Sequence, residues 1–135
     1  MPLDIALSAN TPTATIELRQ AQPLGDGHRH AAFLVVRSGA FAAALPFVFA
    51  RGQLASFAEA LDGLLATRSG TASLLASTSD DIIRFKSADR GILCVCGDLH
   101  EAEGMQRLTF SFVAEWERLE RFIDGIHRLH TRGVN

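Results

Sequence analysis

Apolar and polar side chains alternate in the first part of the chain. Ile16 and Leu18 alternate with Glu17 and Arg19, which predicts a half-buried strand over residues 13–20. The preceding residues 1–12 contain two prolines and a polar run, so we expect them to form an irregular N-terminal segment.

Two further apolar segments follow this strand. Residues 31–37 are apolar on both faces of an extended chain, and residues 41–50 are apolar almost throughout. Ser38 and Gly39 join them by a short connection, which favours antiparallel pairing. Pro46 cannot donate to a strand ladder, so we expect the third strand to lie at a sheet edge or a bulge.

The apolar period then changes from two to that of a helix. Apolar residues recur three and four positions apart from Phe57 to Leu65, which predicts a helix over residues 54–67. Ser56 and Glu59 have the spacing of a capping box, which would satisfy free N–H groups near the start of the helix.

The second half repeats strands before a helix. The pattern predicts strands over residues 71–76, 81–87, 91–99 and 107–113, and a helix over 114–132. The segment from Ile92 to Cys96 is apolar on both faces, which is typical of a central strand covered on both sides. We therefore expect Cys94 and Cys96 to fill part of the core.

Consecutive strands without helices between them argue against a parallel sheet. We predict an α+β fold for residues 1–135 as a single domain, with an antiparallel sheet of about six or seven strands and two helices in the order βββ-α-ββββ-α. Five side chains are expected in its core: Leu61, Leu65, Val95, Phe122 and Ile126.

Composition narrows the class of protein. The chain is 47% hydrophobic and 21% charged, which is typical of a globular domain, and its net charge of −2 does not favour nucleic-acid binding. The longest apolar run, residues 40–50, is too short to span a membrane. Reduced cysteines fit a cytoplasmic protein.

Catalytic motifs are missing from the sequence. It contains no G-x-S-x-G elbow and no phosphate-binding loop, so we expect no catalytic residue, no cofactor and no enzymatic activity. Asp26 with His28 and His30 could imitate an acid–base cluster, but a polar loop explains these residues better.

Metal-ligating residues are scattered over several predicted elements. His100 and Glu101 begin like the zinc motif H-E-x-x-H, but Gly104 stands where the second histidine is needed. His127 and His130 lie one helical turn apart and could place two imidazoles on one side of a helix, but no C-x-x-C pair exists and the other candidate ligands lie on other elements. We therefore expect no metal site.

Acidic residues gather at two places in the second half of the chain. Such an acidic edge is usually solvated, but it could also contact a basic protein partner and speed association with it. The candidate partner-binding patch consists of Asp80, Asp81, Asp98, Glu101 and Glu103.

From Ser56 to the last helix, the spacing of apolar residues and turn glycines resembles that of the WapI-type immunity proteins of bacterial polymorphic toxin systems. The run includes Phe57, Leu61, Gly70, Ile83, Phe85, Gly91, Leu93, Val95, Gly97, Phe110, Phe112, Leu119 and Phe122. Residues 113–116 depart from the acidic residue and glutamine that members often carry there. The resemblance implies a bacterial, cytoplasmic, non-catalytic protein that binds and neutralises a toxin domain. Two alternatives remain open: a small-ligand-binding module, and a structural or regulatory subunit that forms a homodimer through an exposed strand such as the one that contains Pro46.

Overall fold

Eight strands and two helices make up the described part of the chain. The computed structural model describes residues 2–9, 13–77, 79–88, 91–100 and 106–132. The first half contains β1 (Leu3–Ser8), β2 (Ala14–Pro23), β3 (Arg29–Ser38), β4 (Phe41–Ala50) and α1 (Arg51–Thr67). The second half contains β5 (Thr71–Leu75), β6 (Ile82–Ala88), β7 (Ile92–His100), β8 (Arg107–Ala114) and α2 (Trp116–Arg132).

The strands form two antiparallel four-stranded sheets, one from each half of the chain. Their spatial orders are β1-β2-β3-β4 and β5-β6-β7-β8, so each sheet is a simple meander followed by its own helix. The α+β class and the two helices are confirmed. The expectation of one sheet with six or seven strands is wrong, because β1 is a regular strand and, in the described part of the chain, the strands of each half form a sheet of their own.

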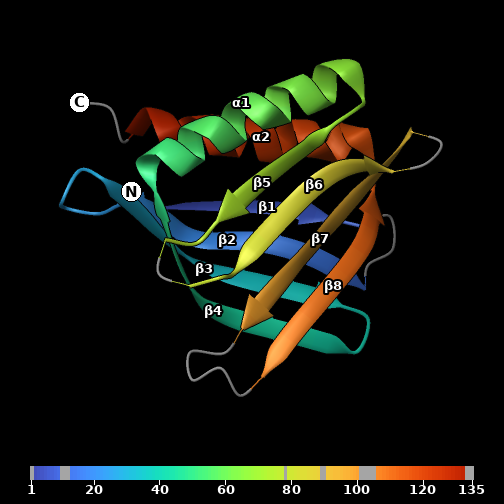
Figure 1. Ribbon diagram of the computed structural model, residues 1–135, viewed down its shortest axis with the longest axis horizontal. Helices are drawn as coiled ribbons and strands as arrows, with labels where there is room; N and C mark the ends of the chain where they lie inside the picture. Colours follow the sequence, from blue (N-terminus) through green and yellow to red (C-terminus); the bar gives the residue numbers. More distant parts are fainter. Residues whose placement is uncertain (1, 10–12, 78, 89–90, 101–105, 133–135) are drawn as a thin grey trace.

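The two sheets cross, and the helices lie together along one side of them (Figure 1). Helix α1 packs on β5, helix α2 packs on β1, and the helices also contact each other. Strands β1 and β5 are the outer strands of their sheets on that side. The opposite outer strands, β4 and β8, lie on the side away from the helices in Figure 1, and β4 contacts α1, which follows it directly in the chain.

Side chains from both sheets and both helices share one core. An aromatic cluster ties α1, β6 and α2 together, because the Phe57 and Phe85 rings lie 5.7 Å apart and the Phe85 and Phe122 rings lie 4.8 Å apart. Four of the five expected core residues are buried, whereas Leu65 is only partly buried at the margin.

Helix α1 begins three residues earlier than the sequence predicts. It follows β4 directly, with Ala50 at its N-cap and no side chain capping it. Ser56 and Glu59 therefore lie inside the helix, and the predicted capping box does not form. Burial of Leu54 and Phe57 holds this end of the helix instead.

Candidate functional site

The sequence-predicted acidic patch is only partly an acidic surface. Asp81 is buried, and its Oδ1 accepts a hydrogen bond from the His100 backbone N–H at 2.8 Å and lies 3.1 Å from His100 Nδ1. Asp81 therefore braces His100 and is not available to a partner. Asp80 is exposed, while Glu101 and Glu103 lie outside the described residues.

The negative charge of Asp98 is offset by Arg107 on the neighbouring strand β8. Arg107 donates to both of its carboxylate oxygens, with Nε 2.6 Å from Oδ1, and Thr109 adds a hydroxyl contact. Hydrogen bonding from Arg107 lowers the pKa of Asp98. The patch thus carries less free negative charge than the sequence suggests, and two of its members position His100 and Arg107.

His100 and Arg107 form one wall of a groove whose other wall is β4. The hollow measures about 530 Å³ and is lined by Phe41–Pro46 on β4 and by Leu99, His100, Gln106, Arg107 and Leu108 from the ends of β7 and β8. Phe41 is 68% exposed although it belongs to a strand, and no side chain from Phe41 to Pro46 is charged. The β4 wall of this groove is therefore apolar along its whole length.

The backbone of β4 leaves unpaired groups facing this groove. In an antiparallel ladder, successive residues direct their N–H and C=O groups alternately to the neighbouring strand and away from it. Pro46 has no N–H, and Val48 uses its carbonyl to accept the Ser77 N–H at 2.8 Å, outside the sheet. Both observations indicate that the even-numbered residues of β4 direct their backbone groups away from β3. Ala42 and Ala44 therefore also direct their N–H and C=O groups away from β3.

The outward edge therefore has two parts. Ser77 covers the end of β4 near Val48, whereas Ala42 and Ala44 have no hydrogen-bond partner on that side among the described residues. Natural proteins usually protect such an edge with charges, a bulge or a covering segment. Here Pro46 limits the free stretch, but residues 41–45 contain no charged side chain that would protect it.

The outer face of the first sheet beside this edge is apolar as well. Phe33, which is 50% exposed, stands opposite Pro46, and the half-buried Val35 stands opposite the exposed Ala44. A chain that paired with β4 would therefore find apolar contacts on both faces of the edge. Pro46 predicted the edge position of β4, which the strand order confirms, but no feature of the sequence predicted the groove.

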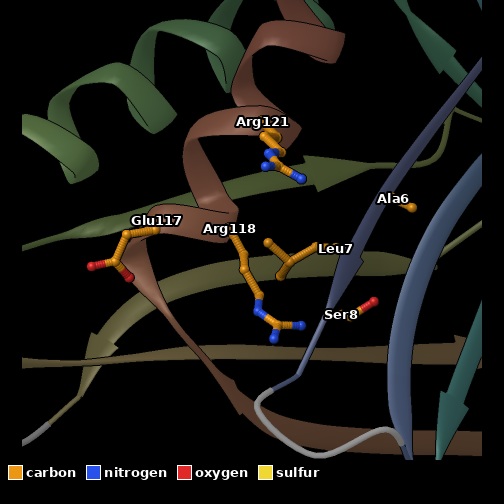
Figure 2. A pocket seen from close by; sticks show the side chains of 6 residues that line it. All are labelled: Ala6, Leu7, Ser8, Glu117, Arg118 and Arg121. Atoms are coloured by element: carbon orange, nitrogen blue, oxygen red, sulfur yellow. The ribbon is translucent and has the colours of Figure 1, made fainter.

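A second hollow, of about 490 Å³, lies between β1 and α2. Figure 2 shows Arg118 and Arg121 directed toward β1, whereas the Glu117 side chain points away from β1. Arg118 donates to the Ala9 carbonyl at 3.0 Å, so its guanidinium supports the chain after β1.

The histidines do not gather into a site. His30 is buried against Phe49, and His127 lies 2.9 Å from Asp62 across the two helices. Asp26 closes its own loop: the backbone N–H of His28 donates to it, and this bond, with Arg29, lowers its pKa to about 2. Within the described part of the chain, no three His, Cys, Asp or Glu side chains come together to hold a metal.

The two cysteines do not lie in the core, where the sequence predicts them. β7 is a central strand, but Cys94 and Cys96 are half-buried on its outer face, and the core side is formed by Leu93 and Val95. Burial raises the pKa of Cys96, and the adjacent Cys94 adds to the shift. The expectation that both thiols fill the core is wrong, because neither helix packs on the outer face of β7.

Comparison with known proteins identifies no relative of this chain. No protein-family model, curated protein or solved structure matches the chain. No helix in the described ranges is long and apolar enough to cross a membrane.

Proposed function

We propose that this chain is a non-catalytic binding protein that receives an extended segment of a partner protein at the free edge of β4. The observation that carries the proposal is the outward-facing backbone of Ala42 and Ala44 beside an apolar groove. An extended chain can satisfy these N–H and C=O groups while it fills the groove, which is the mode of β-strand addition.

The lining of the groove indicates the partner's chemistry. Phe41, Leu45 and Leu108 favour apolar side chains on the inserted strand, while His100 and Arg107 offer polar contacts at one end. Two edge residues can exchange about four hydrogen bonds with the inserted strand, each contributing about 1 kcal/mol. Affinity would therefore depend on side-chain contacts as well as on backbone pairing.

The resemblance to immunity proteins supplies the biological context of this proposal. It implies that the partner is a toxin domain made by the same cell, which the chain neutralises by binding it in a fixed stoichiometry. Such inhibition needs a preorganised surface and no turnover. The free edge is held in place by its whole ladder with β3, from the pair of Arg29 with Ala50 to the pair of Ser38 with Phe41.

The test combines a toxin gene next to the gene for this chain with an edge variant. Cells that express the toxin should grow when the chain is coexpressed, and the purified proteins should form a complex. Ala44→Pro removes an outward N–H without removing a β3 bond, so it should abolish protection and binding. Ala44→Ser keeps that N–H and is the matched control.

A fold control keeps this test decisive. If Ala44→Pro does not fold, Ala44→Lys places a charge on the outer face at the same position and should also block pairing. Equal growth with and without the chain would overturn the toxin assignment. A complex that both folded variants leave unchanged would overturn the binding mode.

Homodimer formation is a second candidate, and the uncharged edge favours it. Two copies of β4 can pair antiparallel around Ala43, which places Ala42 opposite Ala44 of the other copy and Phe41 opposite Leu45. Sedimentation would show a dimer that Ala44→Pro dissociates. A monomer at high concentration would exclude this candidate and leave the partner proposal standing.

A further inference from the structure

Cys94 and Cys96 form a pair of neighbouring thiols on the outer face of the second sheet. They occupy alternate positions of β7, so both side chains leave the same face of the strand. Both cysteines are half-buried. The Cys94 Sγ also lies 3.3 Å from the Ser111 Oγ on β8. Both thiols are therefore partly open to solvent, and the Cys94 thiol contacts the neighbouring strand β8.

Basic side chains flank the dithiol on one side. Lys86 stands opposite Cys94, and Arg84 stands opposite Cys96, on the neighbouring strand β6. Both basic residues are exposed on the same face of the sheet. A negatively charged group at the two sulfur atoms would therefore be stabilised by two adjacent positive charges.

A disulfide between the two sulfur atoms fits this geometry poorly. Residues two apart on a strand are separated by about 6.6 Å, because the chain rises about 3.3 Å per residue. Disulfides usually require Cα separations of 4.4 to about 6.8 Å, so the pair lies near the upper limit. An atom placed between the sulfurs bridges them with less distortion.

We propose that Cys94 and Cys96 bind a soft monovalent metal ion, Cu(I), between their two sulfur atoms. Thiolates are the ligands that Cu(I) prefers, and this ion accepts two ligands in a nearly linear arrangement. Zinc requires four ligands, and the described residues bring no third His, Cys, Asp or Glu side chain to the pair.

Charge balance supports a bis-thiolate complex. Each thiol releases its proton to water as the metal–sulfur bond forms, so one Cu(I) ion and two thiolates together carry a single negative charge. Lys86 and Arg84 lie beside that charge and offset it. No electron is transferred, since copper enters and stays in the monovalent state.

The experiment uses the full chain, reduced and free of tags, under anaerobic conditions. Cu(I) is titrated against a chromophoric chelator of known affinity, which reports how much copper the protein removes. We expect one equivalent to bind and both thiols to become unreactive toward a maleimide. Cys94→Ser and Cys96→Ser should each abolish competition with the chelator.

Three further variants separate a built site from adventitious thiol binding. Arg37→Ala removes an exposed basic residue of the other sheet and is the matched control that should bind like the parent. Lys86→Ala and Arg84→Ala should each weaken binding, on the order of 10-fold or more, as loss of a supporting neighbour does at metal sites. Circular dichroism would verify that every variant is folded.

Several results would overturn the proposal. One is a parent protein that takes no copper from the chelator; another is a single cysteine variant that competes as well as the parent. Full maleimide labelling in the presence of one equivalent of Cu(I) would also contradict it. These outcomes do not bear on the β4 groove, whose free edge belongs to the other sheet.

Discussion

The backbone N–H of Ser77 donates to the carbonyl of Val48 at 2.8 Å, and the Ser77 hydroxyl lies 3.2 Å from the same oxygen. A residue from the segment after β5 therefore closes one end of the β4 edge. The contact joins the two halves of the chain, and it leaves Ala42 and Ala44 as the open part of that edge.

Loss of this contact should lengthen the free edge. Ser77→Pro removes the donor to Val48, which should cost about 1 kcal/mol of stability and extend the stretch available for pairing. We expect faster aggregation on mild heating, measured by light scattering. Ser77→Ala keeps the backbone N–H and is its control; aggregation of the two variants at the same rate would contradict the role given to this bond.

Gly97 should not tolerate a side chain. A Cβ at this position would lie 2.6 Å from the Ile82 carbonyl oxygen and 2.6 Å from the Phe110 ring. Because backbone cannot move aside easily, Gly97→Ala should lower the free energy of unfolding by about 2–3 kcal/mol. Urea denaturation would measure the change.

Gly63 provides the opposite control for that substitution. It lies exposed inside α1, and a Cβ there would meet nothing within 4 Å. Gly63→Ala should therefore stabilise the protein by about 1 kcal/mol, since alanine favours the helix. If both glycine variants were equally stable, the close packing of β7 against β6 and β8 would be contradicted.

Phe122 should be a major contributor to stability. Its ring contacts Phe85 and Phe57, and none of the three is exposed to solvent. Phe122→Ala leaves a cavity between the helices and β6, so we expect a loss of about 3–5 kcal/mol. An unchanged melting temperature would contradict the central position of this ring.

Acid should destabilise the fold through His30. Its ring stacks on Phe49, and neither ring nitrogen has a hydrogen-bond partner within the described ranges. Burial lowers the pKa of His30, and Arg51 and His130 add to the shift; the nearby Leu129 backbone opposes it without reaching hydrogen-bond geometry.

The direction of the pH dependence follows from this shift. The unfolded chain takes up the proton more readily than the folded one, so stability is constant above about pH 7 and falls as pH drops below the unfolded value of about 6.5. Urea denaturation at pH 7.5 and pH 5 should show this fall. His30→Phe should flatten it, whereas His28→Gln, at an exposed position, should retain it.

Most of the described helices and strands are encoded in the local order of apolar and polar residues. The apolar period locates both helices and seven of the eight described strands, because residues such as Ile16, Leu18 and Phe122 must face a core wherever that core lies. It also places β4 at an edge, since Pro46 cannot complete a ladder between two neighbours. Even β1 is encoded: Leu3, Ile5 and Leu7 alternate with Asp4, Ala6 and Ser8, although the flanking prolines favour an irregular segment.

Packing between segments that are distant in the sequence determines how the strands divide into two sheets and which faces of the sheets remain accessible to solvent. The alternation of apolar and polar residues shows which side chains of a strand face the core, but it does not show with which strands that strand pairs. One large sheet and two crossed sheets therefore give similar sequence patterns. The same limit applies to Cys94 and Cys96, which look like core residues on an apolar strand, yet remain partly open to solvent because neither helix packs over them. Likewise, Asp81 looks like a surface carboxylate until the fold places His100 against it.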